Sequence, residues 1–274
     1  MSAAPPHPGH AARFTDAVAL VTGAGTGIGA AVCRRLAAEG ARVVLSGRRE
    51  GPLRKVAGQL GDRALVVAGD AAVKEDMRRV IDSALEVYGR LDVVVASAGG
   101  HHPGAVADTD DDAWRYSMSA NLDSAFVTLR ETLPHLMASG GNAVVLSSIA
   151  GLFAGPGVAG YVTTKHALIG LVRSVARDYG HQGVRVNAVC PGWVRTPMAD
   201  EQMDGLGARY GIDREDAYRL VTKDVPLRRP AEPEEIADLV AFLASREASV
   251  MTGAVVVADG GATCVDLPTL AFAD

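Results

Sequence analysis

The stretch Ala17-Val18-Ala19-Leu20-Val21-Thr22-Gly23-Ala24-Gly25-Thr26-Gly27-Ile28-Gly29 decides the fold of this chain. Its first part is apolar and partly β-branched, which is typical of a buried parallel strand. An amphipathic stretch, 30–39, follows the glycine-rich turn, and Gly40 ends it as a C-terminal cap. Strand, glycine turn and helix form a cradle for phosphate, because glycines let the backbone approach a ligand closely and a helix N-terminus attracts anions.

Alternating strand and helix patterns continue along the rest of the chain without a break. We expect strands near residues 17–22, 42–46, 64–69, 91–96, 143–147, 184–189 and 254–258, with helices between them. A helix between neighbouring strands implies a right-handed crossover and hence parallel pairing. The 274 residues are therefore predicted to form one α/β domain with a doubly wound, parallel, seven-stranded sheet.

Tyr161 and Lys165 are four residues apart, so on a helix their side chains share one face. Ser148 lies thirteen residues before Tyr161, at the end of an expected strand, and can place a hydroxyl in the same space. Together they provide an acid, a cation that changes the pKa of that acid, and a group that polarises a carbonyl. Such a cluster indicates a hydride-transfer site if a nicotinamide lies beside it.

Two motifs, Thr22-Gly-x-x-x-Gly-x-Gly and Tyr161-x-x-x-Lys165, resemble the signatures of the short-chain dehydrogenase/reductase family. The resemblance runs from about Val18 to about Ala262, with further matches at Asp70, Ala96-Ser97-Ala98-Gly99, Asn121-Leu122, Asn187, Pro191-Gly192, Thr196 and Asp259-Gly260-Gly261. It implies the strand order 3-2-1-4-5-6-7 and a ligand crevice at the carboxyl ends of strands 1 and 4. The family usually has asparagine where Ser97 stands, and we expect this difference to alter the structure modestly without loss of chemistry.

The resemblance also implies roles for four catalytic residues, Asn121, Ser148, Tyr161 and Lys165. Tyr161 would donate a proton to a carbonyl oxygen or remove one from an alcohol. The charges of Lys165 and of the oxidised nicotinamide would lower the pKa of the phenol, which is about 10 for a free phenol. The ammonium of Lys165 would also hold the nicotinamide ribose. Ser148 would bind the substrate oxygen, and Asn121 would support a water that links Lys165 to solvent.

The residues after the second expected strand, Gly47-Arg48-Arg49, bear on the choice of cofactor. An acidic residue at Gly47 would bind the ribose of NAD, whereas a guanidinium can pair with the 2′-phosphate of NADP. The segment therefore favours NADP, although Thr26 lacks the basic side chain of many NADP enzymes and NAD stays open. Asp70 is expected to accept from the adenine amino group, and a helix-capping role is compatible with this. The cofactor contacts expected from the family motifs are Gly23, Thr26, Gly27, Ile28, Gly29, Arg48, Arg49, Asp70, Ala71, Ala98, Gly99, Tyr161, Lys165, Pro191, Gly192, Val194 and Thr196.

Mostly apolar side chains are expected to form the substrate site. The candidates are His101, Leu152, Phe153, Trp193, Met198 and Met203, with Val158 as a further wall and the loop around Tyr210 as a lid. They favour a small to medium cyclic, aromatic or aliphatic ketone or secondary alcohol as the partner.

Other functions stay open beside this one. A 3-oxoacyl thioester reductase is disfavoured because the places where such enzymes put basic residues read Ala138-Ser139-Gly140 and His181-Gln182. An enoyl reductase would usually separate the tyrosine and the lysine more widely. A non-catalytic dinucleotide sensor or scaffold need not retain the four catalytic residues.

Composition and local pattern argue against several classes of partner. The net charge is −5 and no basic stripe is present, which argues against nucleic acid. No apolar run approaches the ~18 residues of a membrane helix. His101 and His102 are adjacent and do not converge on a metal, so no metal site is expected. An acidic cluster, 108–112, precedes the helical pattern near Trp114 and favours capping.

Residues 1–13 are rich in proline and small residues and are predicted to be a disordered extension. Residues 14–262 are predicted to form the Rossmann-fold domain, with 196–224 as its mobile substrate loop and 263–274 as a C-terminal tail. Three widely spaced cysteines and the lack of a signal peptide indicate reduced thiols in a cytoplasmic enzyme. The expected edge strand near 253–261 and the apolar tail beyond it predict a homotetramer.

Overall fold

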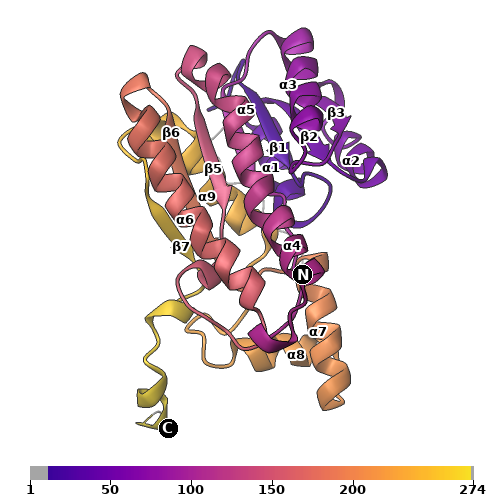
Figure 1. Cartoon of the computed structure of the whole chain (residues 1–274), viewed down its shortest axis with the longest axis vertical. Coiled ribbons are helices and arrows are strands. Elements are labelled where there is room, and N and C mark those ends of the chain that lie inside the picture. Colours follow the sequence, from indigo (N-terminus) through magenta and orange to yellow (C-terminus); the bar gives the residue numbers. More distant parts are fainter. Residues whose placement is uncertain (1–11, 273–274) are drawn as a thin grey trace.

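The computed structural model describes residues 12–272, with seven parallel strands in one central sheet (Figure 1). The strands are β1 (Val18–Thr22), β2 (Arg42–Gly47), β3 (Ala64–Ala68), β4 (Val93–Ala96), β5 (Asn142–Leu146), β6 (Arg185–Pro191) and β7 (Val255–Ala258). Their order is β3-β2-β1-β4-β5-β6-β7, which confirms the predicted fold and topology. The extension predicted to be disordered covers residues 1–13, and residues 1–11 of it lie outside the described residues.

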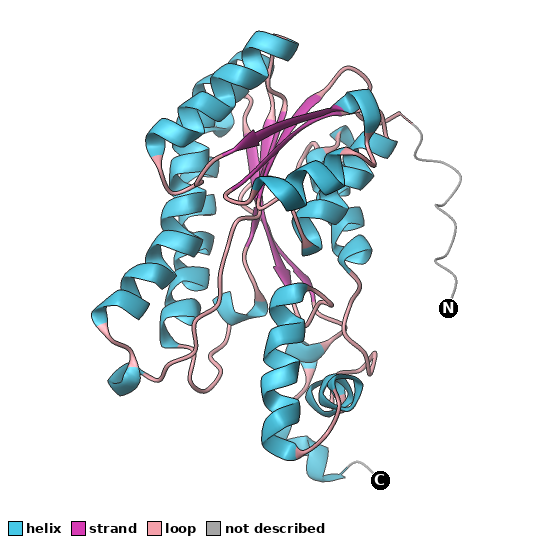
Figure 2. Cartoon of the chain, turned by 90° about the vertical axis from the view of Figure 1, so that its right-hand side faces the viewer, coloured by secondary structure: helices cyan, strands magenta, loops and turns pink. Residues whose placement is uncertain are grey.

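Helices cover both faces of the sheet (Figure 2). One face carries α1 (Gly27–Ala38), α2 (Glu50–Ala57) and α9 (Pro233–Ala244), and the other carries α3 (Lys74–Tyr88), α5 (Ser124–Ser139) and α6 (Ala159–Tyr179). The structure also has α4 (Asp111–Ser117), α7 (Pro197–Tyr210) and α8 (Arg214–Thr222), and a π-helical stretch (Met118–Asp123) joins α4 to α5. Within residues 12–272, no helix has the length and apolar character that a membrane span requires.

The position of β1 in the sheet explains why its apolar residues form a continuous run rather than alternating with polar ones. Successive side chains of a strand point to opposite faces. Ala19 and Val21 belong to the core beneath α1 and α9, whereas Val18 and Leu20 belong to the core beneath α3, α5 and α6. Every residue of β1 is buried, as expected for a parallel sheet with helices on both faces.

The turn from β1 into α1 requires glycine. Gly23 and Gly27 have φ angles of +66° and +52°. These angles lie in the left-handed region, which residues other than glycine rarely adopt. A Cβ atom on Gly29 would lie only 2.3 Å from the carbonyl oxygen of Gly23. Any side chain at Gly29 would therefore separate the first turn of α1 from the end of β1.

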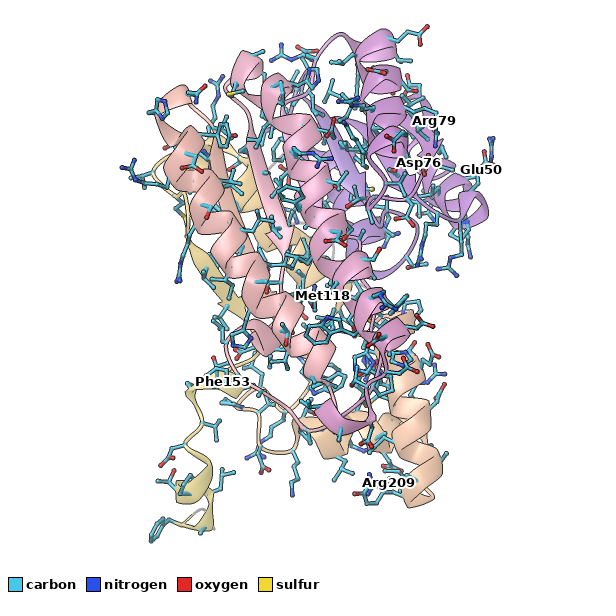
Figure 3. The ribbon with its side chains drawn as sticks, viewed as in Figure 1. Glu50, Asp76, Arg79, Met118, Phe153 and Arg209 are labelled. Carbon is cyan, nitrogen blue, oxygen red and sulfur yellow. The ribbon has the colours of Figure 1, made fainter. Side chains whose placement is uncertain are left out.

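Helices α7 and α8 form the segment 196–224 that was predicted to be the substrate loop. They pack on each other through residues that include Met203 of α7 and Tyr218 of α8. Figure 3 shows that α7 extends away from the sheet, with Arg209 near its far end. The segment is thus helical and has a small apolar core of its own between α7 and α8. Its mobility stays a prediction.

The acidic cluster before α4 has the capping role that the sequence predicted. The side chain of Asp110 accepts a hydrogen bond from the backbone N–H of Ala113 at 2.8 Å. Asp111 and Asp112 form ion pairs with Arg115 on the same helix. These carboxylates complement the positive end of the helix dipole.

Candidate active site

Two adjoining cavities open near the carboxyl ends of the strands. The first has a volume of about 300 Å³ and is bounded by the ends of β1, β2, β4 and β5. The second has a volume of about 380 Å³ and is bounded by the segments that follow β4, β5 and β6, together with α7. The residues that belong to the walls of both are Ile28, Ser147, Tyr161, Thr196 and Met198. A molecule in one cavity can therefore meet a molecule in the other at Tyr161.

The first cavity gathers most of the predicted cofactor residues. Those in its wall are Gly23, Thr26, Gly27, Ile28, Gly29, Arg48, Arg49, Asp70, Ala71, Ala98, Gly99, Tyr161, Lys165 and Thr196. Pro191, Gly192 and Val194 line the second cavity instead, because they lie at or beyond the end of β6, two strands away from β4. The first cavity fits a dinucleotide, since its glycine turn has no room for a Cβ atom at Gly29 and lies at the N-terminus of α1.

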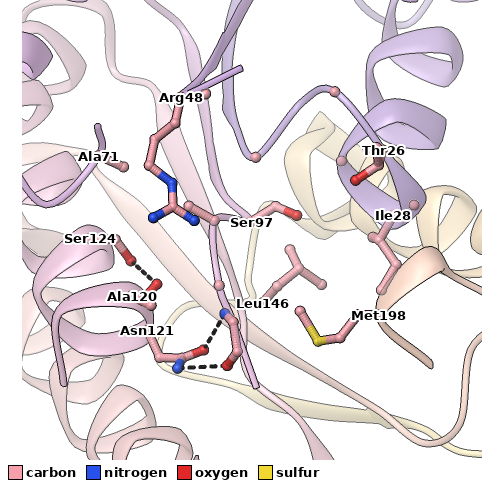
Figure 4. A pocket seen from close by; sticks show the side chains of 18 of the residues that line it. Thr26, Ile28, Arg48, Ala71, Ser97, Ala120, Asn121, Ser124, Leu146 and Met198 are labelled. Carbon is pink, nitrogen blue, oxygen red and sulfur yellow. Dashed lines mark hydrogen bonds between the residues drawn. The ribbon is translucent and has the colours of Figure 1, made fainter. Parts of the chain in front are cut away.

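Arg48 extends from the end of β2 into the first cavity (Figure 4). Arg49 is the N-cap residue of α2, and both arginines are exposed. Asp70 accepts a hydrogen bond from the backbone N–H of Ala72 at 3.0 Å, and it also lines the cavity. Two solvated guanidinium groups thus give positive charge to the rim of the cavity near β2 and β3.

Asn121 lies in the π-helical stretch between α4 and α5 and is 1% exposed. Its amide nitrogen donates to the carbonyl oxygen of Gly100 at 2.9 Å, and its oxygen accepts from the N–H of Gly100 at 3.2 Å (Figure 4). The amide nitrogen also donates to the carbonyl oxygen of Ser117 at 3.1 Å. A Cβ atom on Gly99 would lie 3.0 Å from Asn121 Oδ1 and 3.8 Å from Lys165 Nζ. Asn121 therefore fixes the segment after β4 and lies close to Lys165.

Lys165 is held at the end of β5 by its side chain and by its backbone. Its buried ammonium donates a hydrogen bond to the carbonyl oxygen of Leu146 at 2.9 Å, and its own carbonyl accepts from the hydroxyl of Ser147 at 2.9 Å. Burial lowers the pKa of Lys165 to about 8, because desolvation disfavours the charged form. The ammonium is thus still mostly charged at neutral pH, but it loses its proton at a lower pH than the ammonium of a surface lysine.

Tyr161 stands beside Lys165, whose Nζ lies 5.5 Å from the centroid of the phenol ring. Burial raises the pKa of Tyr161, and its hydrogen bond with Ser148 acts in the opposite direction. The sequence argument expected Lys165 and an oxidised nicotinamide together to lower this pKa, and in the protein alone desolvation dominates. The ammonium hydrogen-bonds the carbonyl of Leu146. The phenol is therefore protonated near neutral pH in the protein alone.

The hydroxyl of Ser148 lies in the wall of the second cavity, directly after β5. Its oxygen accepts a hydrogen bond from the backbone N–H of Ala150 at 3.1 Å. The same hydroxyl can donate its proton to an oxygen in the cavity. Ser148 and Tyr161 thus present two donors to the same region.

Ser97, which stands where the family usually has asparagine, lies at the end of β4 and lines the first cavity. The N–H groups of Ser97 and Ala98 both donate to Thr22 Oγ1, each at 3.2 Å. The hydroxyl of Thr22 therefore links the ends of β1 and β4 through the backbone. This link does not depend on the side chain at position 97, which agrees with the modest structural effect expected there.

The second cavity contains most of the predicted substrate residues, namely His101, Phe153, Trp193 and Met198, together with Val158. Leu152 and Met203 are not in its wall. Leu152 is 36% exposed, and Met203 is only 2% exposed because it packs into the core between α7 and α8. Tyr210, the expected lid residue, lies at the end of α7 and outside both walls.

Sequence reasoning missed Gln202, which lines the second cavity from α7. Gln202 is four residues after Met198, so helical periodicity from that methionine is the signal that points to it. The backbone carbonyl of Leu146, which accepts from Lys165, was also missed. No sequence pattern identifies a single carbonyl at the end of a strand as an acceptor.

The chain is similar to several known proteins over most of its length. A family model described as enoyl-(acyl carrier protein) reductase matches residues 23–263. The chain is 49% identical over 258 residues to Protein MoaE of Klebsiella aerogenes, covering 93% of this chain and 99% of that protein. It is 37% identical over 255 residues to meso-2,3-butanediol dehydrogenase of Serratia marcescens, covering 93% of this chain and 97% of that protein.

A solved structure also matches nearly the whole chain. It is L-sorbose reductase from Gluconobacter frateurii, complexed with NADPH and L-sorbose. The TM-score is 0.86 at 30% sequence identity, and the match covers 90% of this chain and 97% of that chain.

Proposed function

Because the chain belongs to the short-chain dehydrogenase/reductase family, we propose that this NAD(P)-dependent oxidoreductase interconverts a small to medium apolar ketone and the matching secondary alcohol. The observation that carries the proposal is the place of Tyr161, which lies in the walls of both cavities. The first cavity has a glycine turn for a dinucleotide, and the second has apolar walls such as Phe153 and Trp193. A proton donor at the boundary of the two cavities suits a reaction between a dinucleotide in the first and a substrate in the second.

The residues around Tyr161 divide the proton chemistry between them. When bound, the nicotinamide supplies or accepts the hydride. Tyr161 donates its proton to the carbonyl oxygen in reduction and removes the alcohol proton in oxidation. Ser148 stabilises the negative charge that develops on this oxygen. The charged ammonium of Lys165 favours the phenolate form of Tyr161, and Asn121, close to Lys165, supports the route by which protons return from solvent.

The names of related proteins support carbonyl and alcohol chemistry. Meso-2,3-butanediol dehydrogenase and L-sorbose reductase are both named for it. The matching family model is named for enoyl reduction, but the four-residue separation of Tyr161 and Lys165 favours carbonyl reduction. Ser139 and His181 stand where a carrier-protein reductase would place basic residues, which disfavours an acyl thioester as the substrate.

A screen of ketones and secondary alcohols with NADP and NAD, followed by the absorbance of the reduced nicotinamide, tests this proposal. We expect turnover of at least one neutral ketone or secondary alcohol. A protein that binds a dinucleotide but turns over no member of the panel would instead be a sensor or scaffold.

We infer a preference for NADP from Arg48, which extends into the first cavity without an acidic residue beside it at Gly47. Gly47→Asp should shift the ratio of kcat/KM for NADPH over NADH about tenfold or more toward NADH. A carboxylate there repels a 2′-phosphate and accepts from a ribose hydroxyl, and hydrogen bonds to charged groups contribute about 1.5–3 kcal/mol.

Gly47 tolerates this change sterically, because a Cβ atom there would meet only Leu53 Cδ2, at 3.6 Å. The matched control is Arg54→Ala, since Arg54 is exposed, pairs with Glu50 and lies outside the cavity. This control should leave the ratio unchanged, whereas Arg48→Ala should lower it. A higher kcat/KM for NADH in the unmodified protein would contradict the preference.

We also propose a homotetramer in which the C-terminal tail, 263–274, contributes to an interface. β7 lies at the edge of the sheet with Val257 38% exposed, and Phe272 in the tail is 87% exposed. Residues 263–272 of the tail extend away from the sheet (Figure 1). An open edge with exposed apolar side chains favours a second copy, because burying one such side chain contributes about 1.5–3 kcal/mol.

Truncation after Ala262 should reduce the assembly from four copies to fewer, as measured by light scattering. The expected cause is loss of the apolar contacts of the tail, so Phe272→Ser should weaken the assembly in the same direction. A monomeric full-length chain would refute the tetramer. An assembly and an activity that both survive truncation unchanged would refute the role of the tail.

We propose a cytoplasmic location on the basis of the thiols. Cys33 and Cys190 are buried and Cys264 is exposed, and all three are free. Free thiols are typical of a reducing compartment.

A further inference from the structure

Two side chains in the second cavity that can both donate and accept a hydrogen bond take no part in the chemistry proposed above. They are His101, from the segment after β4, and Gln202, from α7. Trp193 adds an indole N–H donor to this wall, and the remaining polar side chains have assigned roles. Two act on the reacting oxygen, while the hydroxyls of Ser147 and Thr196 bond to the backbones of α6 and α7. Beyond the reacting centre, His101 and Gln202 are thus the unassigned groups in this wall that offer a bound molecule both a donor and an acceptor.

His101 has a fixed position close to the reacting centre. Its imidazole ring contacts the ring of Tyr161 edge-on, with 5.5 Å between the centroids and 66° between the planes. The preceding residue, Gly100, is bound through both its N–H and its carbonyl by the side chain of Asn121. A polar atom of the substrate that reaches His101 must therefore lie near the oxygen that Tyr161 protonates.

Gln202 approaches the same cavity from a different element. Its amide nitrogen donates to the carbonyl oxygen of Met198, one turn earlier in α7, at 3.2 Å. The amide oxygen is an acceptor, and the second N–H is a donor. The side chain is partly exposed, so it can turn toward a bound molecule without leaving a buried group unpaired.

The wall of the second cavity carries no formal charge. Within residues 12–272, none of its side chains belongs to lysine, arginine, aspartate or glutamate. Burial lowers the pKa of His101, and the charge of His102 acts in the same direction while Glu201 opposes it. The imidazole is therefore neutral at pH 7. A carboxylate in this cavity would lose its hydration without gaining a cation.

We propose that His101 and Gln202 form a subsite for a second, uncharged oxygen of the substrate. The preferred substrates are then ketones with a nearby hydroxyl or carbonyl group, and the matching diols. A neutral imidazole and a carboxamide each offer a donor and an acceptor, which suits a hydroxyl or carbonyl oxygen. Apolar walls, including Phe153 and Met198, take the rest of the molecule. This inference rests on the proposed function and narrows its substrate class.

Steady-state kinetics with three small ketones test the subsite. The probes are 2-butanone, 3-hydroxy-2-butanone and the anion 3-oxobutanoate, each with saturating NADPH and again with NADH. We expect kcat/KM for 3-hydroxy-2-butanone to exceed that for 2-butanone about tenfold, since a net hydrogen bond corresponds to roughly a factor of ten. The anion should be the poorest of the three.

Variants of His101 and Gln202 test whether these residues cause the preference for the hydroxyketone over 2-butanone. His101→Phe keeps an aromatic ring beside Tyr161 but removes both nitrogens, and it should lower the ratio of kcat/KM for the hydroxyketone over 2-butanone about tenfold. Gln202→Met should lower the same ratio. The matched control is His102→Phe, because His102 contacts Tyr116 edge-on and lies outside the wall of the second cavity. This control should leave the ratio as it is.

The outcomes separate the subsite from the function. A ratio near one in the unmodified protein, or a preference for the anion, overturns the subsite and leaves the ketone chemistry standing. Equal losses with both neutral ketones in His101→Phe would mean that the ring only supports Tyr161, which also overturns the subsite. No turnover of any of the three ketones with either cofactor overturns the subsite, whereas the proposed function falls only if the whole panel of ketones and secondary alcohols gives no turnover.

Discussion

Replacing Tyr161 with phenylalanine should lower kcat by about 10²–10⁴, the range typical of a lost general acid, while the affinity for the cofactor stays within a few-fold. The change removes one oxygen and leaves the ring, so the packing against His101 and Lys165 is retained. Dinucleotide binding, measured by fluorescence or calorimetry, and turnover, measured by nicotinamide absorbance, should therefore respond very differently. The substrate must be one whose hydride transfer limits the rate, as judged by a deuterium isotope effect.

Tyr88→Phe provides the matched control for this experiment. Tyr88 ends α3 and lies outside the walls of both cavities, so loss of its hydroxyl should not change kcat. If Tyr161→Phe retained most of its kcat under the same conditions, the proton donor would have to be another group. A large loss of cofactor affinity would point instead to a binding role for the phenol.

Replacing Lys165 with alanine should damage both cofactor affinity and turnover, each by about tenfold or more. The ammonium lies in the wall of the first cavity and next to the phenol, so its removal takes away a charge that serves both steps. The carbonyl of Leu146 loses its partner as well, and an unpaired buried acceptor costs about 1–3 kcal/mol. Binding titrations together with kcat and KM for the cofactor measure the two effects separately.

The controls distinguish the charge of Lys165 from its structural role. Lys165→Met fills much of the same volume without the charge, and it should retain a higher melting temperature than Lys165→Ala while staying equally poor in turnover. Lys223→Ala removes an exposed lysine that pairs only weakly with Asp224, at 3.9 Å, and should change neither quantity. Normal cofactor affinity in both Lys165 variants would refute the binding role.

Much of the fold could be predicted from the sequence, because its strongest patterns report strong physical constraints. Strands buried on both faces must be continuously apolar. The backbone of Gly23 leaves no room for a Cβ atom at position 29, so only glycine fits there. The contribution of Tyr161 and Lys165 to one cavity wall follows from their spacing on α6. The strand order, by contrast, came from the family resemblance rather than from any local pattern.

The remaining features depend on tertiary packing that no local pattern encodes. Asn121 lies in a π-helical turn, a rare variant of the helix that the surrounding residues do not signal. The apolar character of Met203 predicts burial, but only the pairing of α7 with α8 decides that it faces their core rather than the substrate. Burial of Tyr161, which raises the pKa of its phenol, is likewise a property of the whole site that its local sequence does not report.

The two cavities are built from different kinds of structure, and this division bears on how such a protein diversifies. The dinucleotide side consists largely of strand ends and the first turn of α1, which cannot change without disturbing the sheet. Most of the other side consists of segments 149–158 and 191–202. Their strand pairing is limited to Pro191 at the end of β6 and to two isolated bridges, at Val158 and Val194. Mutations in these segments can accumulate at little cost to folding. A lineage can therefore acquire new substrates repeatedly while inheriting one unchanged redox apparatus.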